Sequence, residues 1–234
     1  MILAVTAGKG GVGKSTVAYN LAAALDAVAV DADLGMADLP TARGPDLHDV
    51  LAGRADAVEA VREDGPVSLL PCGRALAGAR AADPTALGEA VEAVARQYGR
   101  VVIDTPAGMR SDAGLPLLVA DACLLVTRPS RAAVADALRT RELARVIETP
   151  LCEVVLNRVD SAESVETESL ATAFGAPVTT VPESEPLAQA QRSGLPVRAV
   201  DADCPASERF ATLAADVERA LGVSQCSSSP QRCP

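Results

Sequence analysis

The sequence predicts one α/β domain built on a mostly parallel sheet with helices on both faces. Short apolar runs rich in β-forming residues alternate with longer segments whose apolar residues recur at helical spacing, a pattern typical of βαβ units. The chain has 234 residues, of which 49% are hydrophobic, and this is enough for one sizeable core. Because neither an internal repeat nor a linker divides the sequence, we expect one domain over residues 1–222.

Six apolar runs are the expected strands. They contain little polar alternation, which is typical of parallel strands that are covered on both faces. We expect these strands at residues 2–6, 27–31, 67–71, 101–104, 122–127 and 152–157.

Five segments with helical periodicity lie between and after these strands. The last of them has Pro205 in its first turn, apolar residues at helical spacing from Phe210 to Leu221, and Gly222 as a stop. Residues 223–234 have no such periodicity and predict a disordered tail. We expect helices after Lys14, near residues 46–53, and at 84–99, 130–147 and 205–222.

Composition narrows the class of protein. A formal net charge of −10 argues against a protein that coats nucleic acid or an anionic membrane. The acidic, lysine-poor composition resembles that of proteins from halophilic archaea. Six widely spaced cysteines without a C-x-x-C pair favour buried thiols over a disulfide or zinc framework. Met1 leads directly into an apolar run and no apolar stretch approaches 18 residues, so we expect a cytoplasmic protein.

The segment AGKGGVGKST, residues 7–16, joins the first expected strand to the first helix. Gly8, Gly13, Lys14 and Ser15 fill the fixed positions of G-x-x-x-x-G-K-[ST]. Glycines let backbone N–H groups curl around a phosphate, the lysine adds charge at the β/γ-phosphates, and the serine hydroxyl can ligate Mg²⁺. The strand–loop–helix context therefore predicts a nucleotide-binding loop.

Two lysines occupy this loop, and no other lysine occurs in the chain. The chain has 21 basic residues, and the 19 other than Lys9 and Lys14 are arginines. Since arginine serves every other basic position, we infer that lysine chemistry is required at both sites.

Three aspartates follow strands whose carboxyl ends would share one edge of the sheet. Asp104 closes the run VVID and has the form of a Walker B carboxylate that reaches toward Mg²⁺. Asp31 and Asp33 end another strand at the edge where open α/β sheets bind ligands. The alternative for Asp31 is a turn-capping role, which the sequence leaves equally open.

Four motifs together resemble the MinD/ParA group of deviant Walker A P-loop ATPases, with the MinD branch most similar. They are KGGVGKST, DADLGMADL, DTPAGM and LNRVD, and the resemblance covers nearly the whole expected domain. It implies a P-loop NTPase fold, with ATP and Mg²⁺ as cofactors. It also makes Lys9 the signature lysine that reaches across an ATP-sandwiched homodimer, and Asp33 the residue that orients the attacking water.

The resemblance thus implies a set of site residues. Catalytic roles fall to Lys9, Lys14 and Asp33, and metal ligation to Ser15, Asp33 and Asp104. Asn157 matches the adenine-facing asparagine, and residues 181–190 resemble the segment that closes over the base; an asparagine at a strand end is as often a plain turn residue. The residues expected to hold the nucleotide are Gly8, Lys9, Gly10, Gly11, Val12, Gly13, Lys14, Ser15, Thr16, Asn157, Arg158 and Pro182.

We therefore predict an ATP hydrolase that acts as an ATP-driven dimerisation switch in the spatial positioning of cellular assemblies, together with an unidentified protein partner. The alternatives are a nucleotide-gated scaffold with little hydrolysis and an ATP-dependent amide ligase of the same superfamily.

Departures from the family pattern set limits on these predictions. The tail lacks the basic amphipathic helix with which bacterial MinD proteins dock on membranes, so that route is not expected. The absence of paired cysteines argues against an iron–sulfur carrier. Five arginines between Arg128 and Arg145 are the candidate DNA patch, but on so acidic a chain we expect only weak binding. For His48, the one histidine, we expect a helix-packing role.

Overall fold

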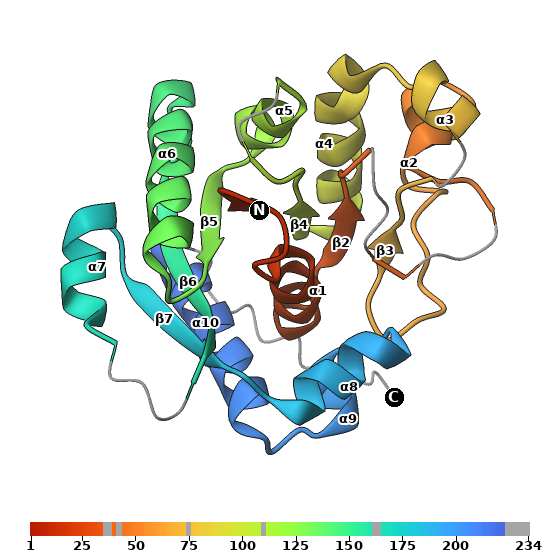
Figure 1. Ribbon diagram of the computed structural model, residues 1–234. Coiled ribbons are helices and arrows are strands. Elements are labelled where there is room, and N and C mark those ends of the chain that lie inside the picture. The colour runs from red at the N-terminus through yellow and green to blue at the C-terminus, as the bar shows by residue number, and fades with distance from the viewer. Residues whose placement is uncertain (35–38, 41–43, 74–75, 109–110, 161–164, 223–234) are drawn as a thin grey trace.

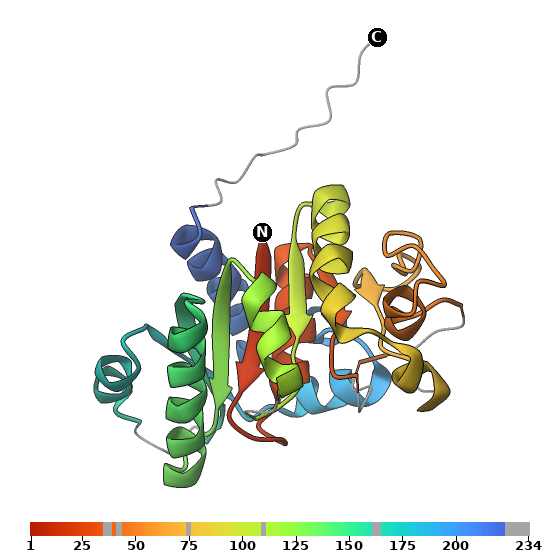
Figure 2. The same cartoon turned by 90° about the horizontal axis from the view of Figure 1, so that it is seen from above.

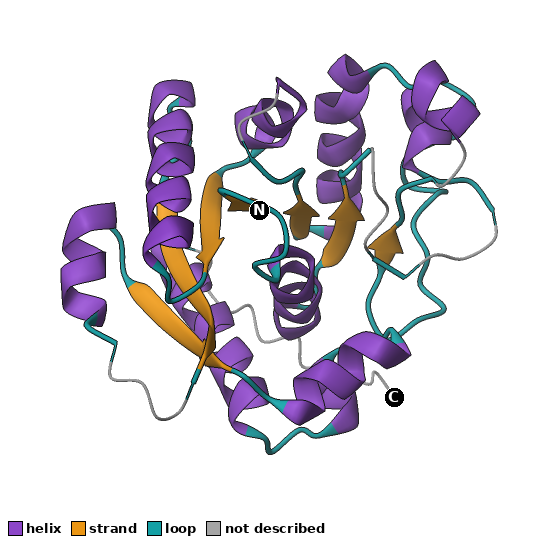
Figure 3. Cartoon of the chain, viewed as in Figure 1, coloured by secondary structure: helices purple, strands orange, loops and turns teal. Residues whose placement is uncertain are grey.

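The computed structural model describes residues 1–34, 39–40, 44–73, 76–108, 111–160 and 165–222. This part of the chain forms a seven-stranded sheet in the order β3-β2-β4-β1-β5-β6-β7, and every neighbouring pair is parallel (Figures 1 and 3). The strands are β1 (Ile2–Ala7), β2 (Val28–Asp31), β3 (Leu69–Leu70), β4 (Val101–Asp104), β5 (Ala122–Thr127), β6 (Leu151–Val159) and β7 (Val178–Pro182).

Helices connect the strands and cover both faces of the sheet. They are α1 (Lys14–Leu25), α2 (Leu47–Leu51), α3 (Leu76–Ala81), the 3₁₀ turn η1 (Pro84–Ala86), α4 (Leu87–Tyr98), α5 (Ser111–Val119), α6 (Arg131–Ile147), α7 (Thr167–Phe174), α8 (Glu185–Ser193), α9 (Val197–Val200) and α10 (Pro205–Ala220).

The sheet separates two apolar layers. On one side, α1 and α10 pack on residues such as Val5 and Leu124, and α8 and α9 extend the same cluster. On the other side, α4, α5 and α6 cover the alternate residues of the same strands, Ala4 and Cys123 among them. Figure 2 shows these two helix layers from above, with the strands between them. The two-sided burial explains why the strands read as continuous apolar runs.

All six expected strands form, and each of the five expected helices lies within or close to its predicted bounds. β3 keeps only two residues, and the expected helix at 84–99 begins as the 3₁₀ turn η1. β7 is a strand that we did not predict. Its sequence VTTVP is only half-buried at the sheet edge, so it lacks the apolar run that marked the other strands. The expected disordered tail, 223–234, lies outside the described residues.

Two expectations from the sequence can be compared with the fold, namely buried cysteine thiols and no apolar stretch long enough to span a membrane. Cys72, Cys123, Cys152 and Cys204, the cysteines within the described ranges, are free thiols, three of them buried. In the same ranges, no helix has the length and apolar character needed to cross a membrane.

Topology places the first loop of the chain at the centre of the molecule. β1 lies between β4 and β5, so the loop that follows β1 emerges beside the carboxyl ends of both neighbours. This is the edge at which ligands bind in open α/β sheets.

Candidate nucleotide site

The loop after β1 turns sharply into α1. Gly13 caps this helix with φ of 95°, a left-handed conformation that favours glycine, and Lys14 is the first helical residue. A Cβ on Gly13 would also lie 2.1 Å from Nδ2 of Asn157. Both the backbone angle and the close neighbour therefore require glycine at the helix N-terminus.

Gly8 is required for a different reason. A Cβ on this residue would lie 2.3 Å from the carbonyl carbon of Asp136, which belongs to the backbone of α6. The start of the loop thus rests directly on the main chain of a helix that begins more than 120 residues later in the sequence.

Asn157 supports the loop from the other side. Its Nδ2 donates a 2.8 Å hydrogen bond to the carbonyl oxygen of Val12, and the side chain is buried. A buried bond of this kind fixes the path of the backbone just before Gly13. In this structure Asn157 therefore shapes the loop, and its predicted contact with adenine stays a prediction.

Lys14 forms a buried ion pair at the base of the loop. Its Nζ lies 2.5 Å from Oδ1 of Asp104, the last residue of β4, and 3.4 Å from Oγ of Ser15. Lys14 is 6% exposed and Asp104 is fully buried. Because the pair is so strongly desolvated, neither charge can lose its partner unless another charge of the same sign as that partner takes its place.

Asp31 lies beside Asp104, because the two residues are register partners on β2 and β4. The Asp31 carboxylate accepts hydrogen bonds from the backbone N–H of Asp33 (3.3 Å) and of Leu39 (3.2 Å). Burial, and then the charge of Asp104, raise the pKa of Asp31 to about 7. Asp31 therefore anchors the loop that carries Asp33, a role related to the turn-capping alternative.

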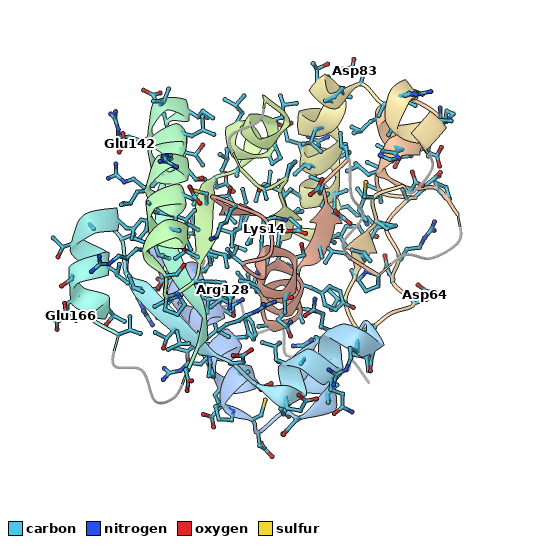
Figure 4. All side chains as sticks on the ribbon, in the orientation of Figure 1. Lys14, Asp64, Asp83, Arg128, Glu142 and Glu166 are labelled. Atoms are coloured by element: carbon cyan, nitrogen blue, oxygen red, sulfur yellow. The ribbon has the colours of Figure 1, made fainter. Side chains whose placement is uncertain are left out.

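A cavity of about 550 Å³ opens above these residues. Predicted site residues among its lining are Lys9, Gly10, Gly11, Gly13, Lys14, Ser15, Thr16, Asp33 and Arg158. Five predicted residues are not in the lining. Gly8 rests on α6, Asn157 bonds to the carbonyl of Val12, Asp104 pairs with Lys14, and Pro182 ends β7. Figure 4 shows Lys14 near the centre of the molecule, at the start of α1.

Half of the lining was not among the predicted site residues, although Leu39, Pro106 and Ala107 lie inside the motifs DADLGMADL and DTPAGM. It consists of Tyr19, Asn20, Leu39, Pro40, Pro106, Ala107, Gln191, Gly194 and Leu195. Tyr19 and Asn20 lie one helical turn beyond Ser15 and Thr16, so helical spacing from the motif would have found them. Gln191 lies one residue beyond the segment 181–190. Pro40, just beyond the motif DADLGMADL, carries no chemistry that marks it in a sequence.

Lys9 differs from Lys14 in its surroundings. It is half-buried at the lining of the cavity, and within the described part of the chain it makes no ion pair or hydrogen bond that would hold its ammonium. The two lysines of the loop therefore differ in the contacts that the structure describes.

Residues 3–197 match the CobQ/CobB/MinD/ParA nucleotide binding domain. The chain belongs to this family. The match includes the loop, all three aspartates and Asn157, and it stops inside α9. The resemblance of the four sequence motifs to the MinD/ParA group is thereby confirmed.

Individual relatives are similar over almost the full length. An uncharacterised ATP-binding protein of Methanocaldococcus jannaschii is 35% identical over 227 residues, which span 92% of this chain and 86% of the relative. The cell division ATPase MinD of Pyrococcus furiosus superimposes with a TM-score of 0.86 at 29% identity, over 93% of this chain and 98% of that one. The septum site-determining protein MinD of Pyrococcus horikoshii, solved as its Mg-ADP complex, gives 0.86 at 28% identity over 95% and 97%.

Proposed function

We propose that this protein is a Mg²⁺-dependent ATPase that dimerises around ATP and uses slow hydrolysis to switch between partner-bound and free states. The observation that carries the proposal is the cavity at the N-terminus of α1, which Lys9, Lys14, Ser15 and Asp33 all line. Cationic, hydroxyl and carboxylate groups at a helix N-terminus form the donor set of a magnesium–nucleotide site.

Lys14 and Asp104 would exchange partners when nucleotide binds. Lys14 would turn its ammonium from Asp104 to the β/γ-phosphates, and the carboxylate would then need a new cation. Ser15, Asp33 and Asp104 are the residues that would hold Mg²⁺, which supplies charge neutralisation at the phosphates. Because Mg²⁺ would supply beside Asp104 the positive charge that Lys14 takes to the phosphates, we expect nucleotide and Mg²⁺ to bind together.

Asp33 and Lys9 would act on hydrolysis from opposite sides. Asp33 lines the cavity and would orient the attacking water, while Lys9 would reach the nucleotide of a second subunit. Positioning and charge neutralisation account for most of the catalysis of phosphoryl transfer, so no covalent step on the protein is required.

A role in spatial positioning is supported by the relatives rather than by any single residue. The Pyrococcus proteins carry the names cell division ATPase and septum site-determining protein. We propose the same class of role here, in the cytoplasm and with a protein partner that reads the ATP-bound dimer.

The test combines ATP turnover with light scattering. Wild type should hydrolyse ATP slowly with Mg²⁺ and not with EDTA, and should dimerise with Mg²⁺ and a non-hydrolysable ATP analogue but not with ADP. Asp33→Ala should keep the dimer with ATP itself and lose turnover, which makes it the bait for partner capture. A protein that stays monomeric in all nucleotide states would contradict the proposed switch. Dimerisation without turnover would instead favour the scaffold alternative.

A further inference from the structure

His48 and Cys72 form a buried pair behind the loop that carries Asp33. Asp46 begins α2 with a capping box: its carboxylate accepts from the N–H of Asp49, and the Asp49 carboxylate accepts from the N–H of Asp46. This cap fixes the first turn of α2 and places His48 inward, where it is 2% exposed. Cys72 follows β3 closely and is also 2% exposed.

Both side chains contact the main chain of that loop. Nε2 of His48 lies 3.1 Å from the carbonyl oxygen of Leu34, and Sγ of Cys72 lies 3.4 Å from the carbonyl oxygen of Asp33. The same Nε2 and Sγ are 3.5 Å apart. Two adjacent carbonyls are thus held by one residue of α2 and one residue of the segment after β3.

One assignment of protons satisfies these contacts. A carbonyl oxygen can only accept, so Nε2 of His48 must carry a proton and donate to Leu34. Sγ of Cys72 is then left as the donor of its own contacts, with the carbonyl oxygen of Asp33 at 3.4 Å and that of Gly73 at 3.6 Å.

The backbone of Asp33 is consequently held at both ends. Its N–H donates to the carboxylate of Asp31 and its carbonyl accepts from Cys72, while Asp33 itself lines the nucleotide cavity. Neither His48 nor Cys72 is among the lining residues, so they do not compete with Asp33 for the cavity.

We propose that His48 and Cys72 are positioning residues that hold the main chain of Asp33 and Leu34, so that the Asp33 carboxylate faces the nucleotide. This inference rests on the proposed hydrolytic function of Asp33. A small displacement of a catalytic group is enough to lower turnover strongly while the nucleotide stays bound by the loop after β1.

Matched variants separate the hydrogen bond from the packing. His48→Leu fills much of the volume without a donor, whereas His48→Gln carries an amide N–H at about the distance of Nε2. Cys72→Ala and Cys72→Ser form a second pair, which changes the side-chain volume less than the His48 substitutions do. Serine keeps a hydroxyl donor and alanine does not. Thermal unfolding establishes the temperature at which every variant is folded, and all kinetics are measured well below it.

We expect His48→Leu and Cys72→Ala to lower kcat by about 10-fold or more, with affinity for Mg-ADP within about 2-fold of wild type. His48→Gln and Cys72→Ser should recover most of the loss. If His48→Leu fails to fold, the cysteine pair decides alone. A kcat for the donor-free variants within about 2-fold of wild type would overturn the proposal, as would equal losses in the matched partners.

Amide hydrogen exchange tests the positioning without any hydrolysis. The N–H groups of Asp33, Leu34 and Leu39 should exchange faster in His48→Leu than in His48→Gln, while the N–H of Val197, bonded to Asn20 on α1, should not change. Unchanged exchange at Asp33 and Leu34 would overturn the positioning role. If wild type shows no turnover but exchange responds as expected, the proposed hydrolysis fails and the positioning of the loop stands.

Discussion

Lys9 and Lys14 stand five residues apart in one loop, and their surroundings separate their roles. Lys14 is buried against Asp104, while Lys9 is half-buried at the cavity lining and has no such partner within the described residues. We propose that the buried ammonium of Lys14 serves the nucleotide of its own chain, and that Lys9 serves the nucleotide of a second subunit.

Substitution of each lysine should therefore give a different defect. Lys14→Ala should weaken binding of Mg-ADP by about 10- to 100-fold, because a charge-assisted contact to phosphate is lost. Lys9→Ala should bind Mg-ADP within about 3-fold of wild type, yet fail to dimerise with an ATP analogue. Lys9→Arg should also dimerise poorly, since a planar guanidinium replaces a compact ammonium. Nucleotide titration beside light scattering checks both, and a Lys9→Ala protein that dimerises like wild type would refute the trans role.

Glu153 is a buried carboxylate far from the nucleotide cavity. It lies on β6, is 4% exposed, and accepts a 3.0 Å hydrogen bond from the Thr179 hydroxyl of β7. Burial raises the pKa of Glu153 above its ordinary 4.5, and the nearby charge of Asp216 raises it further, although the Thr179 bond opposes the shift.

The sign of this shift predicts how stability depends on pH. The folded protein binds the Glu153 proton more tightly than the unfolded chain does. The stabilisation that this proton gives the folded state is therefore complete below pH 4.5 and is lost as the pH rises through the raised pKa of Glu153. Glu153→Gln keeps an acceptor for Thr179 and removes the titration. The free energy of unfolding of the variant, relative to wild type, should therefore be higher at pH 8 than at pH 5. Urea unfolding at both pH values measures this, and a pH-independent difference would contradict it.

At the scale of elements, the nucleotide loop depends on α6 and β6 as much as on its own glycines. Gly8 touches the backbone of α6 and the carbonyl of Val12 is held by Asn157 of β6. The loop is thus built on contacts that are remote in sequence.

Two glycines of the loop form a matched test of this dependence. Gly8→Ala would place a Cβ 2.3 Å from the α6 backbone, so we expect a loss of about 1–3 kcal/mol in unfolding free energy and weaker nucleotide binding. Gly10→Ala meets nothing within 4 Å and Gly10 does not have a positive φ, so stability should change by less than about 0.5 kcal/mol. Denaturant melts of both variants decide the matter. Equal stability of the two would show that the loop can move away from α6 at no cost.

The same remoteness limits what the sequence predicts. The motif and the strand ends predicted that Lys14, Ser15 and Asp104 lie together, as they do, because those positions follow from spacing and from the edge rule for parallel sheets. Gly8 was expected to hold phosphate, yet its contact is α6, and no local pattern carries that information. Pro40 and Leu195 line the cavity only through the path of the chain in space. β7 was missed because a half-buried edge strand lacks a buried strand's apolar signal.

For the molecule as a whole, the candidate surface for nucleic-acid binding consists of the arginines between Arg128 and Arg145. On α6, Arg139 pairs with Asp136 at 2.8 Å, and Arg141 and Arg145 pair with Glu142 at 2.7 and 2.8 Å. Figure 4 shows Glu142 on the outer side of α6. Acidic neighbours on the same helix offset much of this positive charge, and the chain carries −10 overall.

Duplex DNA should therefore not be retained at physiological salt, roughly 0.15 M, by the protein with or without ATP. Glu142→Gln releases two arginines and should increase binding measurably at low salt, with the increase disappearing as salt is raised. A filter-binding titration over salt concentration provides the measurement. Firm retention of DNA by wild type at 0.15 M would refute this reading of the surface.

The central place of β1 has a consequence for synthesis of the protein. The first strand to leave the ribosome must wait for residues 101–104 and 122–127 to gain its neighbours, then for α6 to meet Gly8 and for Asn157 to hold Val12. Nascent chains that end at residue 127 should consequently not bind labelled Mg-ADP, and binding should begin only after Asn157 has emerged. Binding by the shorter chains would contradict this order. We therefore expect ATP to bind only a nearly complete domain, so that ATP binding does not assist the earliest stages of folding.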